Sequence, residues 1–265
     1  MIKSGNIKKR ASGVPILSHD QIDELGERLA GDFQPEILAN PQPLDIEAFI
    51  ELYMGLKLDY KFLSNCGKYL GMTVFNDTDR VIFYDPCRDC ADYMHASAGT
   101  VIIDSTLLTP KSEHRMRFTL GHEGAGHAFL HEDYYSRHSQ SNALCASPEG
   151  MLLESRDQYH ERRTGKWAKR TDEDWMEWQA DAMSSATLMP RCSVIKHVRA
   201  VQESTKFCGL TGQQQPYYLI ESLMARYNVS FQAAMMRLKH LRCIPGGYYH
   251  SFQLQYVLSH DHYEE

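Results

Sequence analysis

Residues 117–127 read RFTLGHEGAGH, and this stretch decides how the rest of the chain must fold around it. The Thr109-Pro110 pair upstream is typical of an N-cap and a first-turn proline, so we expect one helix from there to about Leu130. His122 and His127 are five residues apart, which at about 100° per residue leaves their side chains roughly 140° apart around a regular α-helix. A π-bulge would bring both onto one face, and the small Gly-Ala-Gly run between them permits one.

The two histidines and the glutamate between them resemble the zinc-peptidase signature, in which both histidines bind zinc and the glutamate is the general base. The usual histidine spacing is four, and a similar six-residue motif serves the dipeptidyl peptidase III family. The competing pair, His127 and His131, has the four-residue spacing but lacks a glutamate directly after its first histidine. We therefore expect His122 and His127 to bind Zn2+, with Glu123 as the catalytic base.

A catalytic zinc site also needs a third protein ligand and an open position for water. The candidates are Glu177 and Asp181, which share one face of a helix expected from Asp172 to Met189. One of these carboxylates is expected to ligate the metal, while the other accepts the second ring proton of a ligating histidine and fixes its tautomer. A solvated acidic face is the alternative interpretation of this pair.

The sequence around both motifs resembles the ImmA/IrrE-type metallo-endopeptidases. The similar segments are Arg117–Glu123 with Gly126-His127 and His131, Glu177–Asp181 leading to Leu188-Met189-Pro190, Gly99–Asp104, and Val229-Ser230 with Ala233-Ala234 and Arg237-Leu238. The resemblance implies a zincin-like domain that holds Zn2+ through His122, His127 and Glu177, with Glu123 as base. Asp181 is then the carboxylate expected to orient a ligating histidine. Better-known members of the family cleave or inactivate helix-turn-helix repressors, often on mobile elements or in stress responses. The family pattern has the four-residue histidine spacing, so this chain departs from it by one residue.

The expected fold class is α+β, mostly helical with a small three-stranded sheet and C-terminal helices. Residues 1–43 are expected to form a polar tail, loose up to residue 15, and an N-terminal helix. Residues 44–190 are expected to form the zincin-like metallopeptidase domain, and 191–265 a helical region packed on it. The expected strands, rich in β-branched and aromatic residues, are Met72–Phe75, Val81–Tyr84 and Thr100–Ile103.

A long insertion at 133–170 interrupts the predicted metallopeptidase domain. Connections of this length are usually functional or disordered, so it is either a lid over the substrate cleft or a mobile segment. Its arginines and lysines favour a solvated segment, with docking of an acidic partner as the alternative.

The composition excludes several classes of protein. With 43% hydrophobic and 23% charged residues the chain is in the globular range, and a net charge of -6 provides no global reason to bind nucleic acid. No apolar run approaches the roughly 18 residues of a membrane span, and Val14–Leu17 is too short for a signal-peptide core. The seven cysteines are mostly far apart and fit reduced thiols, so we expect a cytoplasmic protein.

Two smaller groups of metal-ligand residue types lie elsewhere in the chain. Cys87 and Cys90, with His95 close behind, are half of a possible structural metal site, but no second cysteine pair follows at matching spacing. Reduced cysteines in a loop between strands are the favoured interpretation. The histidines of the C-terminal tail are expected to be exposed; they are His250, His260 and His262.

Two functions remain open from the sequence. The favoured one is a zinc endopeptidase that hydrolyses a peptide bond in a regulatory protein, with a helix-turn-helix transcriptional repressor as the expected partner. The alternative is an inactive or weakly active member of the same family that acts on a repressor by binding alone. Neither function requires direct nucleic-acid binding or a membrane.

Overall fold

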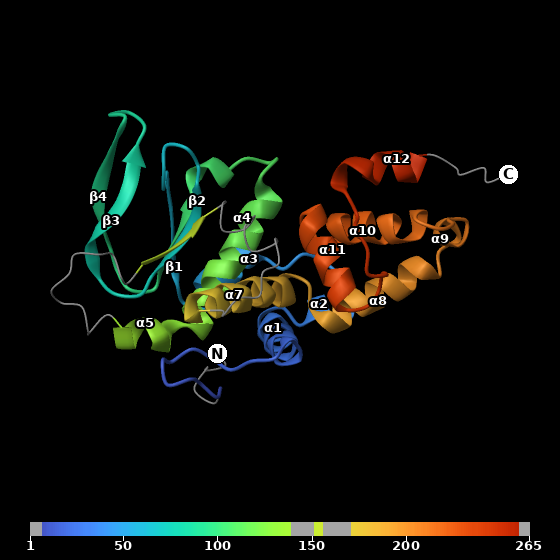
Figure 1. The fold of residues 1–265 in the computed structure, drawn as a ribbon, viewed down its shortest axis with the longest axis horizontal. Helices are drawn as coiled ribbons and strands as arrows, with labels where there is room; N and C mark the ends of the chain where they lie inside the picture. The colour runs from blue at the N-terminus through green and yellow to red at the C-terminus, as the bar shows by residue number, and fades with distance from the viewer. Residues whose placement is uncertain (1–6, 139–150, 156–170, 260–265) are drawn as a thin grey trace.

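The computed structural model describes residues 7–138, 151–155 and 171–259, which form an α+β structure (Figure 1). A four-stranded sheet has the order β1-β5-β2-β6, and β3 pairs with β4 in a separate hairpin. The strands are β1 (Lys57–Lys61), β2 (Tyr69–Val74), β3 (Thr78–Asp85), β4 (Cys90–Ala96), β5 (Thr100–Asp104) and β6 (Met151–Ser155). The longer helical elements are α1 (His19–Phe33), α4 (Glu113–Leu120), η4 (Gly121–Ala128), α5 (Glu132–His138), α7 (Asp172–Leu188), α8 (Arg191–Gln202), α10 (Gln214–Tyr227), α11 (Phe231–His240) and α12 (Leu254–Ser259).

The short elements fill the connections between the longer ones. They are α2 (Glu36–Ala39), α3 (Ile46–Ala48), the π-helix η2 (Phe49–Tyr53), the 3-10 helices η3 (Ser105–Leu107) and η6 (Ser251–Gln253), and α9 (Thr205–Cys208). Residues 46–53 form one turn of α-helix followed by a π-turn, with the Asp45 side chain as the N-cap.

The central strand β5 is buried on both faces because different elements cover each one. Val101 and Ile103 point into the main core, which the helices supply, whereas Ile102 points into a smaller cluster with Val81 of the β3–β4 hairpin. This is the two-residue alternation of a strand. On the helical side, η4 packs between β2 and α7, and α1 covers α7 from beyond (Figure 1). The motif helix is thus enclosed between the sheet and a second helix.

The expected three-stranded sheet is partly wrong. Met72–Phe75 and Thr100–Ile103 correspond to β2 and β5, which pair antiparallel, but Val81–Tyr84 lies in β3, outside that sheet. The strand at Lys57–Lys61 was not expected, and it pairs parallel with β5. β6 belongs to the 133–170 insertion and adds an antiparallel edge strand beside β2. A strand pattern in a sequence indicates that a segment is a strand but not which strand it pairs with. The observed sheet therefore differs in membership from the expected one.

Side-chain caps mark the starts of several helices. Ser18 and Gln21 form a capping box on α1, and Thr171 and Asp174 form one on α7. The Ser230 side chain caps α11 in the same position. The motif helix starts later than predicted, at Glu113, because residues 109–112 form a turn closed by the Ser112 amide donating to the Thr109 carbonyl.

A buried ion pair joins the C-terminal helices to the N-terminal one. The guanidinium of Arg237 on α11 pairs with Asp23 on α1 and also donates to the carbonyl of Met189, at 3.0 Å. Burial alone would raise the pKa of Asp23, but Arg237 and a hydrogen bond with His240 lower it below its ordinary value. One hydrophobic cluster extends from α1 to Ile244, so α11 packs on the same core as the sheet and motif helix.

The N-terminal segment corrects another expectation. Residues 7–16 lie against the body of the protein instead of forming a loose tail, and Val14 is fully buried. Polar composition predicted mobility here, whereas the buried Val14 and two ion pairs hold the segment in place. Within the described residues, no helix combines the length and apolar character needed to cross a bilayer.

Candidate metal centre

The motif helix changes its winding where the histidines lie. α4 gives way to a π-helix, η4, over Gly121–Ala128. In a π-helix each turn contains more residues than in an α-helix, so side chains five apart come to the same side. The Nε2 atoms of His122 and His127 are accordingly 2.9 Å apart. The π-bulge predicted from the five-residue spacing is confirmed.

Three glycines allow η4 to pack this closely. A Cβ on Gly126 would lie 2.6 Å from the Cβ and 2.7 Å from the Cα of Ala180, and one on Gly121 would lie 2.5 Å from the Oγ of Ser184, both on α7. A Cβ on Gly124 would lie 2.0 Å from Ile50. Gly121 and Gly126 therefore set the distance between the helix that carries the histidines and the helix that carries Glu177, and Gly124 allows η2 to approach η4.

We expect Gly126→Ala to lower the free energy of unfolding by about 1–2 kcal/mol. The added methyl group meets backbone atoms of α7 that cannot rotate away, and this overpacking outweighs the roughly 1 kcal/mol that alanine gains in a helix. Urea unfolding measures the change. Gly246→Ala is the control, since nothing lies within 4 Å of its Cβ position, and it should change stability by less than about 0.5 kcal/mol. Equal stability of Gly126→Ala and wild type would contradict the tight packing.

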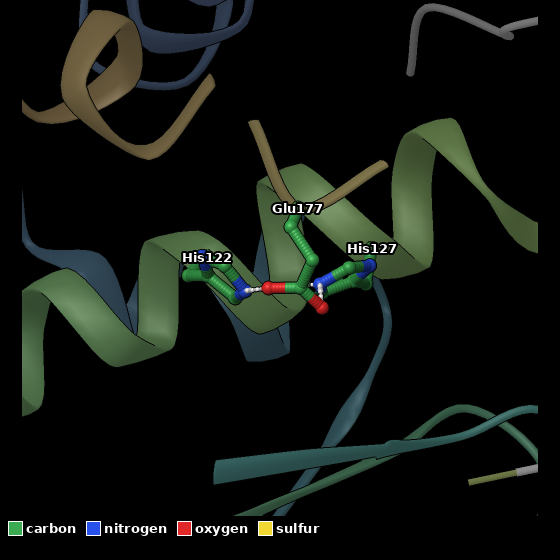
Figure 2. A group of neighbouring side chains, drawn as sticks. All are labelled: His122, His127 and Glu177. Atoms are coloured by element: carbon green, nitrogen blue, oxygen red, sulfur yellow. Dashed lines mark hydrogen bonds and ion pairs between the residues drawn. The ribbon is translucent and has the colours of Figure 1, made fainter. Parts of the chain in front are cut away.

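Glu177 on α7 completes a group with the two histidines (Figure 2). Its Oε2 lies 3.6 Å from Nε2 of His122, and its Oε1 lies 3.7 Å from Nε2 of His127. One ligand atom from each residue lies within 4.8 Å of the other two. All three residues are buried, with the Glu177 side chain 10% exposed and both histidines fully enclosed. The structure thus brings together the three residues that the sequence proposed as ligands, and this group could hold a metal ion.

The donor set suits a small divalent cation. Two imidazole nitrogens and one carboxylate oxygen are ligands that zinc accepts, and ligand atoms of a tetrahedral zinc lie roughly 3.3 Å apart. The separations here, 2.9 to 3.7 Å, are close to that value. A carboxylate facing two nitrogen lone pairs also leaves a concentration of negative potential that a cation neutralises.

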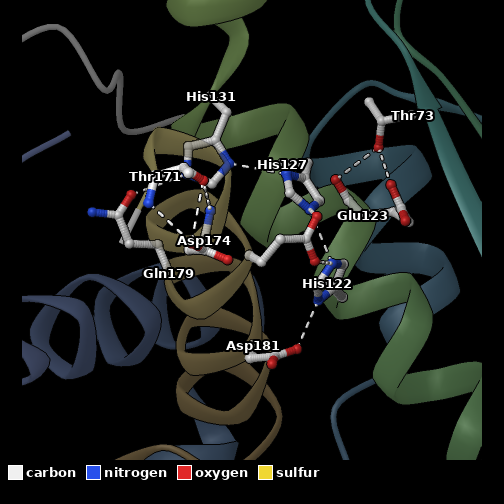
Figure 3. A network of polar contacts seen from close by, with 10 residues as sticks. Thr73, His122, Glu123, His127, His131, Thr171, Asp174, Gln179 and Asp181 are labelled. Atoms are coloured by element: carbon white, nitrogen blue, oxygen red, sulfur yellow. Dashed lines mark hydrogen bonds and ion pairs between the residues drawn. The ribbon is translucent and has the colours of Figure 1, made fainter. Parts of the chain in front are cut away.

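Asp181 lies one turn beyond Glu177 and orients the first histidine (Figure 3). Its Oδ1 is 2.9 Å from Nδ1 of His122. A carboxylate can only accept, so Nδ1 of His122 donates and Nε2 of the neutral ring keeps its lone pair toward His127 and Glu177. The contact expected for Asp181 is present, and the solvated acidic face is not the arrangement found.

Glu123 follows His122 directly on η4, and its carboxylate faces β2 of the sheet (Figure 3). The hydroxyl of Thr73 on β2 donates to its Oε2 at 2.6 Å and also lies 3.1 Å from its carbonyl oxygen. Gly71 leaves room for this side chain, because a Cβ there would lie 3.0 Å from Cγ of Glu123. Both Glu123 and Thr73 are buried. Sequence reasoning missed Thr73, because nothing local in a strand marks one threonine as the neighbour of a helix 50 residues later.

His131 lies behind His127 and not across the metal group. Its Nδ1 is 3.0 Å from Nδ1 of His127, and its Nε2 is 3.0 Å from Oε1 of Gln179. Burial lowers the pKa of His131 to about 3, so the ring is neutral at neutral pH. The competing pair, His127 and His131, is therefore joined through the Nδ1 atoms and not through the nitrogen of His127 that faces Glu177. Gln179, the other partner of His131, is a second supporting residue that sequence reasoning missed.

The other candidate groups remain apart from this centre. Cys87 and Cys90 are exposed at the turn between β3 and β4, and His95 contacts Asp79 at 2.7 Å. In the part of the chain that the structure describes, the group of His122, His127 and Glu177 is the one found that could hold a metal. His250 is exposed and stacks on Phe252, whereas His260 and His262 lie outside the described residues, as does most of the basic insertion.

No family model matches the chain, and no curated protein matches it significantly.

Proposed function

We propose that this protein is a zinc-dependent endopeptidase. The observation that carries the proposal is the buried group of His122, His127 and Glu177 on a π-helix, with Glu123 directly after the first histidine. A group used for structural metal binding does not require a buried carboxylate beside it. Retention of Glu123 in that position supports a catalytic centre.

The residues divide the chemistry of peptide hydrolysis between them. Zinc held there would lower the pKa of a coordinated water towards about 7 and polarise the scissile carbonyl. Glu123 takes a proton from the attacking water and returns it to the leaving amine, as a general base and then a general acid. Thr73 holds the Glu123 carboxylate in place, and Asp181 holds the ring of His122. Glu177 and Asp181 are more exposed than the two histidines, so solvent comes closest to the metal group on the side of these carboxylates.

We further propose a regulatory protein as the substrate, with a helix-turn-helix transcriptional repressor as the first class to test. This part of the proposal rests on the resemblance of segments 117–131 and 177–190 to the ImmA/IrrE-type peptidases. The net charge of -6 favours recognition of the repressor protein over recognition of its DNA.

Incubation of the zinc-loaded full chain with a proteome-derived peptide library tests the activity. We expect new internal termini by mass spectrometry, their loss when a chelator removes the metal, and their return when zinc is added back, because the attacking water needs the metal. A panel of helix-turn-helix repressors then tests the substrate class. A chain that holds about one zinc, cleaves no peptide and still captures a repressor would replace the endopeptidase with the binding-only function.

A further inference from the structure

The N-terminal segment reaches the metal centre from outside the two motif helices. We call residues 7–16 the N-terminal strap. Its ends pair in a β-bridge between Lys9 and Pro15, and the amide of Arg10 donates to the carbonyl of Val14 at 2.8 Å. The Val14 side chain is buried against Tyr135 of α5 and Met176 of α7. The strap is therefore an ordered loop that spans both helices.

Charged contacts and one close approach fix the strap in this position. Arg10 pairs with Asp172 at the start of α7 at 2.6 Å, and Lys9 pairs with Asp133 on α5 at 3.3 Å. Gly13 has a φ of +97° and packs on the backbone of Tyr134, where a Cβ would lie 3.1 Å from Cα. A side chain at Gly13 would be strained in two ways, by its backbone angle and by this contact.

The strap ends in a hydrogen bond that fixes the orientation of a buried amide. The Gln179 side chain donates from Nε2 to the carbonyl of Pro15 at 2.7 Å. A carbonyl can only accept, so the amide nitrogen must face Pro15 and Oε1 must face His131. Oε1 can likewise only accept, so Nε2 of His131, 3.0 Å away, carries a proton.

The proton on Nε2 of His131 also determines the proton position on His127, which belongs to the metal group. His131 is fully buried and its partner Gln179 carries no charge, so burial favours the neutral ring. A neutral ring with its proton on Nε2 has Nδ1 as an acceptor. Nδ1 of His127, 3.0 Å away, must be the donor of that hydrogen bond. Nε2 of His127 keeps its lone pair, directed at Nε2 of His122 and at Glu177. The tautomer of His127 is thus set by hydrogen bonds that begin at Pro15.

We propose that the N-terminal strap is a positioning element of the metal centre, acting through Gln179 and His131 to hold His127 in the metal-binding tautomer. The inference rests on the proposed zinc site. It adds that the metal centre depends on the N-terminal strap, which lies outside both sequence motifs. Asp181 does the same for His122, and it lies on α7 only one turn from the ligand Glu177. His127 has a longer chain of contacts, and that chain runs through a segment 164 residues away from Gln179 in sequence.

Two measurements on the zinc-loaded full chain test the relay. Long-range proton–nitrogen NMR of the histidine rings should show protons on Nδ1 of His127 and on Nε2 of His131. Gln179→Leu should bind zinc about 10–100-fold more weakly in competition with a chelating dye, the usual effect of losing a partner of a ligating histidine. Gln202→Leu, an exposed glutamine on α8, should bind zinc as the wild type does. A proton on Nδ1 of His131, or unchanged affinity in Gln179→Leu, would overturn the relay.

A matched pair in the strap tests its own contribution. Val14→Asp places a carboxylate at a fully buried position and should displace the strap, whereas Ile16→Asp changes a side chain that is 47% exposed. We expect weaker zinc binding in Val14→Asp alone. Equal zinc affinities would show that the strap does not support the centre. Zinc binding that follows these expectations in a chain without peptidase activity would refute the endopeptidase and leave the relay intact, so the two failures are distinguishable.

Discussion

His127→Ala is expected to weaken zinc binding by more than about a hundredfold, so that the variant no longer carries the one ion per chain of the wild type at micromolar protein. Zinc binding to a protein site is worth on the order of 10 kcal/mol or more, and losing one of three ligands removes roughly 3 kcal/mol, more than about a hundredfold in affinity. The loss is sharpened here because the two Nε2 atoms face each other at 2.9 Å on one helix, so no other imidazole of η4 can replace the missing one. Native mass spectrometry reads the stoichiometry, and competition with a chelating dye reads the affinity.

The control for this experiment is a second buried histidine outside the centre. His197 on α8 is 8% exposed and contacts the hydroxyl of Ser222 at 2.6 Å, so His197→Ala removes a comparable side chain and hydrogen bond. It should keep one zinc. Glu177→Gln tests a second ligand of the same group without leaving a cavity, because the amide has the shape of the carboxylate without its charge. Zinc retained by His127→Ala would show that the ligand set is wrong.

The winding of the motif helix could be predicted because it follows from spacing. Two histidines five residues apart cannot share a face of a regular α-helix, and the glycines between them allow the local rearrangement that η4 shows. The capping boxes at Ser18 and Thr171 could be predicted for the same reason, since each depends on residues three positions apart. Spacing along one helix also placed Asp181 one turn from Glu177.

The supporting contacts could not be predicted because they join distant segments. Thr73 reaches Glu123 across 50 residues, and Pro15 reaches Gln179 across 164. Nothing in the strap sequence distinguishes Val14 from the other apolar residues near the N-terminus, so a polar composition favoured a loose tail. The separation of β3 from the main sheet has the same cause, because β3 and β5 have similar strand patterns and differ in their partners.

Glu123→Gln is expected to leave zinc binding unchanged and to lower peptide hydrolysis by about 10²–10⁴-fold, the usual contribution of a general base. Glutamine keeps the size of the side chain, and its amide oxygen can still accept the hydrogen bond from Thr73, so the packing against β2 is preserved. It cannot take a proton from water. The rate on one peptide identified from the library, compared at equal zinc occupancy, measures the effect.

The same change at an exposed position separates loss of a base from loss of charge. Glu173→Gln on α7 removes a carboxylate that contacts Tyr134 at the surface, and it should hydrolyse the peptide at the wild-type rate. If Glu123→Gln also lost its zinc, the carboxylate would be needed to hold the metal, and its role as a base would have to be tested in another way. If Glu123→Gln kept both zinc and full activity, the base would be a different residue, because a glutamine beside the ligands cannot carry the proton from the attacking water to the leaving amine.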